Sequence, residues 1–268
     1  MRSWKSLLAK PGSSVRMKDL DPGETLGWEK EEGLAQIEAN RRRLAELHEL
    51  LWAENQRSLL VVLQGMDTSG KDGVIRHVMT GLNTQGCSVT SFKKPVGEEA
   101  DHDYLWRIGR ALPARGDIGI FNRSHYEDVL VVRVHELVPE EVWKLRFDQI
   151  NAFERIVSEN GTVILKFFLN ISKDEQKQRL QERLDDPTKN WKFSEADIDE
   201  RKLWPRYMEA YEDVLKKCST ADAPWWMIPA DRKWMRNLAV SSIMVEALEK
   251  MKLKWPRPTI DPSKIVIP

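Results

Sequence analysis

The chain has 268 residues and no net formal charge, because 42 lysines and arginines balance 42 aspartates and glutamates. Hydrophobic residues make up 41% of it, which is enough for a substantial core and excludes wholesale disorder. No apolar run reaches 18 residues and no apolar stretch follows the N-terminal cations, so we expect neither a membrane span nor a secretory signal. Cys87 and Cys218 form neither a disulfide framework nor a metal-ligand spacing, which indicates a reducing cytoplasm.

Residues 1–28 are predicted to form an irregular N-terminal arm, because prolines and glycines interrupt them before any periodic pattern develops. A long helix is then expected over residues 29–55, where leucines and an isoleucine recur at helical spacings. Its run of three arginines at 41–43 is interpreted as a solvated face rather than a phosphate site. We expect residues 29–268 to form a single domain.

Five short apolar runs follow and alternate with amphipathic stretches. The runs cover residues 59–63, 87–92, 118–121, 162–169 and 225–228. The helical stretches lie near residues 72–82, 102–111, 140–159, 173–184 and 203–217, and a last helix covers residues 232–252. Short, continuously apolar strands that alternate with helices predict an α/β fold, a three-layer α/β/α sandwich around a five-stranded parallel sheet.

Two segments depart from this alternation. Residues 184–202 are polar, contain a proline and carry both charge signs, so they form either an ordinary surface insertion or a mobile lid. The lid is favoured because of the phosphate motif described below. The tail, residues 255–268, has four prolines and is expected to lie extended on a surface. Trp225 and Trp226 fall in a strand-like run and are assigned to the core, and the neutral charge argues against a nucleic-acid partner.

The most informative segment follows the first apolar run and matches the Gly-x4-Gly-Lys spacing of a P-loop. We name residues 65–73 the phosphate loop; its candidate phosphate-binding residues are Gly65, Thr68, Ser69, Gly70, Lys71, Asp72 and Gly73. Gly65 and Gly70 allow close approach of the backbone, whose successive N–H groups point at phosphate oxygens. Lys71 is expected to reach the transferred phosphoryl group. Asp67 and Asp72 add two anions to this anion site, which implies a cation, Mg²⁺, between them and the phosphates.

A second polar segment, residues 122–128, follows the third apolar run. The end of the strand beside a P-loop strand usually offers acidic groups to the metal, so Asp67, Glu127 and Asp128 are the candidate ligands. Arg123 is expected to supply positive charge to the transferring phosphoryl group. The alternative is a helix start whose acidic first turn only complements the macrodipole. His125 is interpreted as a positioning or packing residue.

Five segments together resemble the polyphosphate kinase 2 family, from about residue 26 to the C-terminus. They are the phosphate loop, Asp103-Tyr-Leu-Trp-Arg107, Asn122-Arg-Ser-His-Tyr-Glu-Asp128, Trp191-Lys192 and Ala223-Pro-Trp-Trp-Met-Ile-Pro-Ala230. The resemblance implies a thymidylate kinase-like P-loop fold with a helical lid. It also implies phosphoryl transfer between inorganic polyphosphate and nucleotides that depends on Mg²⁺, with Mn²⁺ as an alternative metal.

The segment that begins at Phe121 departs from the family pattern. Many members read Phe-Asp-Arg-Ser-Trp-Tyr-Asn-Arg where this chain reads Phe-Asn-Arg-Ser-His-Tyr-Glu-Asp, so position 122 is an amide and positions 127 and 128 are carboxylates. This pattern is similar to the class III subgroup, which phosphorylates both nucleoside mono- and diphosphates. The partners implied are polyphosphate, AMP, ADP, ATP and guanine nucleotides, together with further copies of the chain in a dimer or tetramer.

A polyphosphate chain requires a track of cations even on a neutral protein. The candidates are Lys93, Lys94, Arg123, Arg133, Arg179, Arg183, Lys189 and Lys192. Arg179 and Arg183 are four residues apart and share a helix face, whereas the alternative is that each cation pairs with a nearby acid, as Glu175 allows for Arg179.

The expected mechanism is direct in-line transfer without a covalent intermediate, in which Arg123 and Arg183 neutralise charge in the transition state. Two other functions stay open from the residues alone. One is an ATP-dependent nucleoside monophosphate kinase or another P-loop phosphotransferase. The other is a non-catalytic sensor of polyphosphate or nucleotide.

Overall fold

A five-stranded parallel sheet forms the centre of the protein in the computed structural model, which describes residues 3–261 and 264–267. The strand order is β2-β3-β1-β4-β5. The bounds are β1 Ser58–Gln64, β2 Cys87–Ser91, β3 Ile118–Asn122, β4 Thr162–Asn170 and β5 Trp225–Pro229. The α/β prediction with five parallel strands is thereby confirmed. All seven residues of β1 are buried, because this central strand is covered on both faces.

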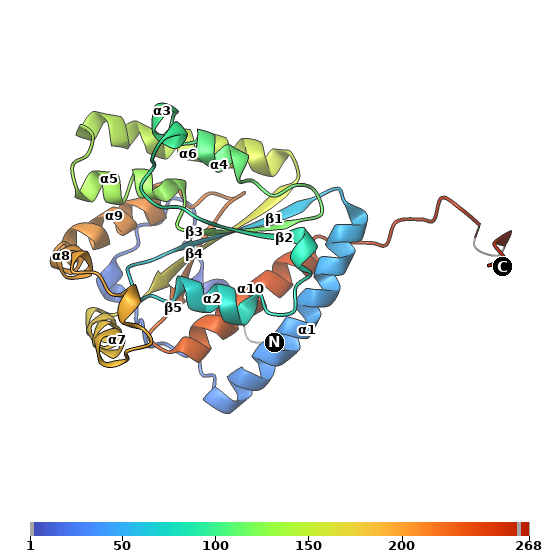
Figure 1. The fold of residues 1–268 in the computed structure, drawn as a ribbon, viewed down its shortest axis with the longest axis horizontal. Coiled ribbons are helices and arrows are strands. Elements are labelled where there is room, and N and C mark those ends of the chain that lie inside the picture. The colour runs from blue at the N-terminus through green and yellow to red at the C-terminus, as the bar shows by residue number, and fades with distance from the viewer. Residues whose placement is uncertain (1–2, 262–263, 268) are drawn as a thin grey trace.

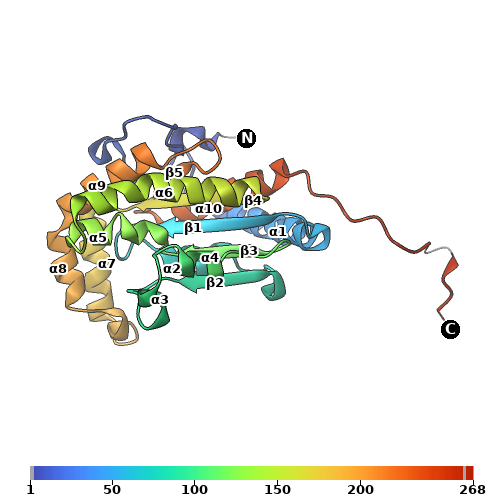
Figure 2. The ribbon, with the colours of Figure 1, turned by 90° about the horizontal axis from the view of Figure 1, so that it is seen from above.

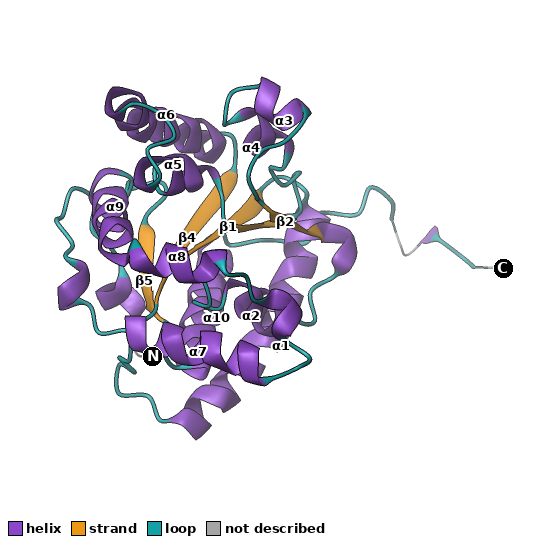
Figure 3. Ribbon diagram, turned by 60° about the vertical axis from the view of Figure 1, so that its left-hand side comes forward, coloured by secondary structure: helices purple, strands orange, loops and turns teal. Residues whose placement is uncertain are grey.

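Helices cover both faces of the sheet (Figure 1). One face carries α1 (Lys30–Glu54), α2 (Lys71–Val78) and α10 (Lys233–Lys250), which pack against one another. The other carries α5 (Val131–Val134), α6 (Glu140–Glu159) and α9 (Trp204–Lys217), with the short helices α3 (Glu98–Asp101) and α4 (Trp106–Arg110) beside α6. Figure 3 shows the strands enclosed between these groups, as a three-layer sandwich requires.

The carboxyl ends of the strands meet at one edge of the sheet, where α7 (Lys173–Asp185) and α8 (Ala196–Lys202) lie (Figure 2). The 3₁₀ turn η5 (Asn190–Lys192) connects these two helices, so the segment expected to form a lid sits above this edge. Two further 3₁₀ turns, η3 (Thr84–Gly86) and η4 (His125–Asp128), precede β2 and follow β3. Ser172 caps α7 by accepting a hydrogen bond from the Glu175 N–H, which fixes where the helix begins.

The N-terminal arm runs beside β5, and its described part contains the 3₁₀ turns η1 (Trp4–Leu7) and η2 (Met17–Asp19). The Ala9 N–H donates to the Trp225 carbonyl at 2.9 Å, and Leu8 bridges Trp226 in the antiparallel sense. The arm therefore covers an edge of the sheet that would otherwise expose unpaired backbone groups. Trp225 and Trp226 are both buried, as the core assignment predicted.

The described part of the C-terminal tail, residues 255–261 and 264–267, does not lie on a surface, contrary to the expectation from its prolines. Beyond α10 its described residues extend away from the body (Figures 1 and 2), and the exposed fractions of Trp255 and Ile267 are 63% and 89%. Within the described residues, no helix has the length and apolar character needed to span a membrane.

Candidate active site

The phosphate loop connects β1 to α2 at the carboxyl edge of the sheet. Gly65 has φ 152°, and a Cβ there would lie 2.7 Å from the Leu169 carbonyl oxygen, so only glycine fits. Gly70 has φ 100°, and Thr68 adopts φ 63°, which is a strained conformation for a β-branched residue. The hydroxyl oxygens of Thr68 and Ser69 are buried, and the described residues offer them no hydrogen-bond partner. Buried hydroxyls of this kind fit a bound anion that would accept their hydrogen bonds.

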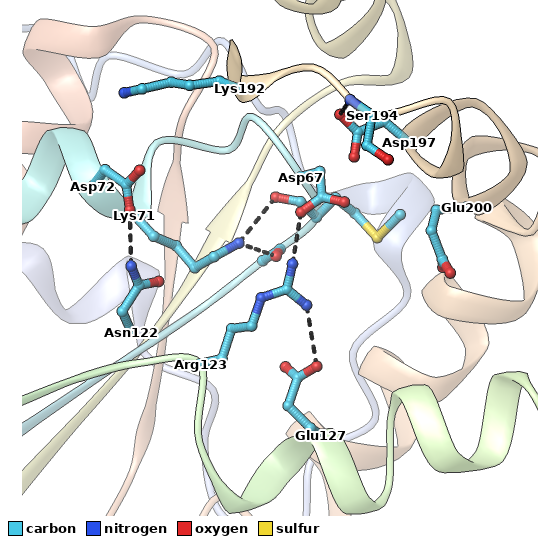
Figure 4. A network of polar contacts seen from close by, with 12 residues as sticks. Asp67, Lys71, Asp72, Asn122, Arg123, Glu127, Lys192, Ser194, Asp197 and Glu200 are labelled. Atoms are coloured by element: carbon cyan, nitrogen blue, oxygen red, sulfur yellow. Dashed lines mark hydrogen bonds and ion pairs between the residues drawn. The ribbon is translucent and has the colours of Figure 1, made fainter. Parts of the chain in front are cut away.

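Lys71 begins α2 and is buried at the floor of the loop. Its Nζ donates to the carbonyl oxygens of Gly65 at 2.7 Å and Met66 at 3.3 Å (Figure 4). Burial, followed by the charge of Arg123, lowers the pKa of Lys71 to about 8, while Asp67 opposes this shift. The ammonium group therefore sits in a site where an additional anion would stabilise its charged form.

Arg123 lies between two carboxylates. Its Nη2 donates to Asp67 Oδ1 at 2.8 Å and its Nη1 to Glu127 Oε2 at 3.2 Å (Figure 4). The charge of Glu127 is the main cause of the raised pKa of Arg123, and that of Asp67 adds to it. β1 and β3 are neighbours in the sheet, which brings Asp67, Arg123 and Glu127 together at one edge. Carboxylate oxygens are the donors that Mg²⁺ prefers, so the donor chemistry of Asp67 and Glu127 suits a magnesium ion, while in this conformation the Arg123 guanidinium lies between them.

Asp128 does not join these two carboxylates. Its Oδ1 accepts a hydrogen bond from Arg146 Nη1 at 2.9 Å, and it lines a separate cavity of about 480 Å³ with Tyr104 and Arg107. Burial raises the pKa of Asp128, against the opposing charges of Arg146 and Arg107. Among residues 3–261 and 264–267, no three histidine, cysteine or acidic side chains are grouped so that they could hold a metal ion. The expected three-carboxylate set is thus not assembled in this conformation.

Asn122 and Asp72 face each other across the loop. The Asn122 amide donates from Nδ2 to Asp72 Oδ1 at 2.8 Å, and Asp72 stands in the first turn of α2, where the helix dipole favours a negative charge (Figure 4). The amide at position 122 therefore satisfies a carboxylate that a second carboxylate would repel. Asp72 lines the loop cavity, as its place in the motif predicts.

A cavity of about 370 Å³ opens above the phosphate loop and is lined by cations from five parts of the chain. They are Lys71, Arg123, Arg179, Arg183, Lys189, Lys192 and Lys233. Arg183 lies 3.5 Å from Asp197, and Lys189 lies 2.6 Å from Asp186, so both of these cations have carboxylate partners. Lys192 packs over the Trp191 ring at 5.0 Å. Of these seven cations, Lys233 is the one that the sequence analysis did not single out. It stands at the start of α10, where no local motif marks it.

Arg179 lines this cavity, but its nitrogens are taken up by other groups of the protein. Its Nε pairs with Glu175 at 2.7 Å, which is the alternative that the helical spacing left open. Its other nitrogens donate to the carbonyl oxygens of Thr68 at 2.9 Å and Ala230 at 2.8 Å. Arg179 thus fixes the conformation of the phosphate loop.

Three candidate cations lie away from this cavity. Lys93 and Lys94 are exposed after β2 and do not line it. Arg133 pairs with Asp213 at 2.7 Å and packs over the Trp143 ring, in a different cavity of about 880 Å³. The structure therefore does not bring these three to the phosphate loop.

The structure places two acidic residues of the lid segment at the site that the sequence analysis did not single out. Asp197 of α8 lies near Asp67, and Glu200 faces the same cavity of about 240 Å³ as Glu127 (Figure 4). Burial, and then the charge of Asp67, raise the pKa of Asp197. No local motif distinguishes these residues from the other acids of this segment, because only the fold of the lid places them at the site.

Comparisons of the sequence and of the structure with known proteins all lead to the same family. The family model described as polyphosphate kinase 2 matches residues 27–256. The AMP/ADP-polyphosphate phosphotransferase of Meiothermus ruber is 51% identical over 98% of this chain and 99% of its own length. The ADP-polyphosphate phosphotransferase of Rhodopseudomonas palustris is 49% identical over 81% of this chain and 79% of its own. The crystal structure of polyphosphate kinase 2 from Arthrobacter aurescens TC1 is 44% identical and superposes with a TM-score of 0.91, over 96% of this chain and 95% of that one.

Proposed function

Because the chain belongs to the polyphosphate kinase 2 family, we propose that it transfers phosphoryl groups between inorganic polyphosphate and AMP or ADP. The protein is a polyphosphate-dependent nucleotide phosphotransferase, and the reaction is reversible because each transfer exchanges one phosphoanhydride bond for another. The observation that carries this proposal is the cationic cavity above the phosphate loop of a protein with no net charge. Such local concentration of cations suits a polyanionic donor.

The donor's terminal phosphoryl group is assigned to the backbone amides of the phosphate loop and to Lys71. Arg123, which already bridges two carboxylates, and Arg183 of α7 neutralise the charge that spreads over the phosphoryl oxygens in the transition state. An ionised phosphate oxygen of the acceptor attacks in line, so no general base is required. His125 is buried and bonded to Glu154, away from this cavity, and its role is packing.

The acceptor nucleotide is assigned to the 480 Å³ cavity that contains Asp128. Arg107 and Arg146 supply positive charge there, and the Tyr104 ring supplies an aromatic surface for a base or ribose. Asp128 lines this cavity at the end of η4. It directly follows Glu127, which is one of the two carboxylates that pair with Arg123. In this arrangement Asp128 contacts the acceptor and orients Arg146.

A magnesium ion is assigned to Asp67 and Glu127, whose oxygen donors suit it, and Mn²⁺ would fit the same donors. When bound, the metal neutralises phosphate charge. Arg123 lies between the two carboxylates, so it holds both side chains toward the site and balances their charge without a substrate.

Residues 184–202 are assigned the role of a lid within the domain that spans residues 29–268. This segment carries Lys189 and Lys192 to the loop cavity, so its closure brings cations to the donor and excludes water from the reacting phosphates. Exclusion of water suppresses wasteful hydrolysis of polyphosphate. Assembly of the chain into a homo-oligomer and use of guanine nucleotides belong to the same proposal.

The test supplies the protein with Mg²⁺, polyphosphate and one of AMP, ADP, GMP or GDP, and resolves the nucleotide products over time. We expect ADP and then ATP from AMP in the complete absence of ATP. Formation of ADP only when ATP is added would instead identify an ATP-dependent monophosphate kinase. Binding of polyphosphate without any product, in the wild type as in the Lys71→Ala variant, would identify a sensor.

A further inference from the structure

Arg236 is a buried cation that lies directly behind the phosphate loop. It stands in the first turn of α10, and only 3% of its surface is exposed. Its Nη1 lies 3.3 Å from the Ser69 carbonyl oxygen, to which it donates, and its Nε and Nη2 donate to Asn237 Oδ1 at 3.1 and 3.0 Å. No carboxylate of the described chain forms an ion pair with it, in contrast to Arg179, which has Glu175.

Two glycines of the loop make room for this guanidinium group. A Cβ on Gly70 would lie 1.7 Å from Arg236 Nη1, and a Cβ on Gly73 would lie 2.7 Å from Nη2. The positive φ of Gly70 already requires glycine, but Gly73 lies inside α2 with an ordinary helical φ. Alanine is favoured over glycine at such a position. A methyl group at position 73 would therefore require the buried guanidinium group to move, whereas the backbone itself would accept alanine.

A buried cation without a carboxylate partner is unfavourable unless another charge compensates it. Burial, followed by the charge of Arg179, lowers the pKa of Arg236 to about 10. Within the described residues, the neighbouring site suited to an anion is the phosphate loop, whose Thr68 lines the loop cavity and whose Thr68 and Ser69 hydroxyls have no partner. A polyphosphate bound there would supply the missing negative charge through the thickness of the loop.

We propose that Arg236 is a positioning residue of the phosphate loop, which holds the Ser69 carbonyl from behind and requires glycine at position 73. It does not touch the donor. It orients the loop so that the N–H groups face the donor phosphate, and its charge is compensated when polyphosphate binds. This inference rests on the proposed function, because it takes the loop as the seat of the polyphosphate donor.

The test is a double-mutant cycle between Arg236→Met and Gly73→Ala, with Arg236→Lys as the conservative variant. Michaelis constants for polyphosphate and for ADP are measured separately. Arg236→Met is expected to raise the KM for polyphosphate by about tenfold or more, the scale of one hydrogen bond to a charged group, and to leave the KM for ADP nearly unchanged. Arg236→Lys is expected to recover part of this loss. Lys250→Met, at the exposed far end of α10, is the matched control and should change neither constant.

Gly73→Ala distinguishes a specific contact from a general loss of packing. The added methyl group displaces the guanidinium in the wild type, so it is expected to raise the KM for polyphosphate there and to have little effect in the Arg236→Met background. Equal effects of Gly73→Ala in both backgrounds would overturn the inference. If Arg236→Met does not fold, an unchanged KM for polyphosphate in both Gly73→Ala and Arg236→Lys would overturn it as well.

A thermal shift without nucleotide separates this inference from the proposed function. Ligands that bind only the folded state raise its apparent stability, so polyphosphate is expected to raise the melting temperature of the wild type more than that of Arg236→Met. Equal shifts in the two proteins would contradict the role of Arg236 even if the wild type catalyses transfer. A wild type that polyphosphate stabilises more than it stabilises Arg236→Met, but that transfers nothing, would refute the proposed function and leave the role of Arg236 supported.

Discussion

The replacement of Lys166 by methionine is expected to destabilise the protein strongly. Lys166 lies in β4 with an exposed fraction of 0%, and its ammonium group contacts Glu154 Oε2 at 2.5 Å. It also donates to the Tyr126 hydroxyl and to the Cys218 carbonyl oxygen, both at 2.7 Å. Tyr126 belongs to η4, the turn that carries Glu127, so this buried cluster also holds one side of the site.

The size of the effect follows from the burial of the partner. Methionine retains most of the volume of lysine but leaves the Glu154 carboxylate in the core with only the Tyr126 hydroxyl and the His125 ring as hydrogen-bond partners. Breaking one side of a buried pair in this way costs about 3–5 kcal/mol, which is a large part of the ~5–15 kcal/mol that stabilises a typical domain. The double variant Lys166→Met with Glu154→Gln removes both charges, and its loss is expected to be smaller than the sum of the two single losses.

The pH dependence of this stability loss tests the role of the charge independently. Burial alone would raise the pKa of Glu154, but the charge of Lys166 and a hydrogen bond from His125 hold that pKa below its ordinary value. The wild-type carboxylate therefore contributes stability that is present above its unfolded pKa and is lost as the pH falls through the folded one. Without Lys166 the shift reverses, and protonation on folding is favoured. The deficit of the variant should therefore shrink between pH 7 and pH 5.

Urea denaturation, followed by the fluorescence of the 11 tryptophans, measures the free energy of unfolding at both pH values. The exposed Lys144→Met, on the surface of α6, is the matched control and should leave the midpoint nearly unchanged. A loss below about 1 kcal/mol, the size of an ordinary surface pair, would refute the reasoning. An equal deficit at pH 7 and pH 5 would refute the account of the charge.

Four further predictions concern the site. Lys71→Ala is expected to lower kcat/KM by about 10²–10³-fold, the scale of one lost transition-state donor, and wild-type turnover would remove Lys71 from the mechanism. Glu127→Gln should raise the Mg²⁺ concentration needed for half-maximal rate, whereas an unchanged titration would contradict its role as a ligand. Asp128→Asn should change the ratio of the KM values for AMP and ADP, and an unaltered ratio would place the acceptor elsewhere. Because the pKa of Lys71 is lowered to about 8, kcat/KM for polyphosphate should fall as the pH rises through that value, and a flat profile to pH 10 would count against this assignment.

The fold was predictable because its signals are local. Continuous apolar runs in β1 and β4 indicate strands covered on both faces, and their alternation with helices implies parallel pairing. The grouping of Asp67, Lys71, Arg123 and Glu127 follows from the same logic, because carboxyl ends of neighbouring parallel strands share one edge of the sheet. Spacing in the sequence and topology together therefore determine this part of the site.

The position of Asp128 could not be derived in the same way. Residues 125–128 form a 3₁₀ turn, in which successive side chains point about 120° apart. Glu127 therefore faces Arg123, while Asp128 faces Arg146 of α6. Adjacency in the sequence suggested a shared role, and the geometry of the turn separates the two carboxylates.

The residues that the sequence did not reveal come from elements that tertiary packing alone brings to the site. Arg146, Lys233 and Arg236 lie on α6 and α10, far along the chain from the phosphate loop and without a motif of their own. The pairing of Arg179 with Glu175 could be anticipated, because residues four apart on a helix are neighbours. Gly73 was visible as a glycine, but its reason lies in a side chain 163 positions away that only the fold places against it.

The net charge of the whole chain predicts little about a site of this kind, because cations can be concentrated at one cavity while nearby acids balance their charge. Three cations of the loop cavity are balanced locally: Arg183 by Asp197, Lys189 by Asp186 and Lys233 by Glu182. Such pairs at a partly exposed surface are weak, so a polyanion with several negative charges can take over the cations without a large cost. The acids thus limit repulsion among clustered cations before the substrate binds, and a protein with zero net charge can still hold a chain of phosphates.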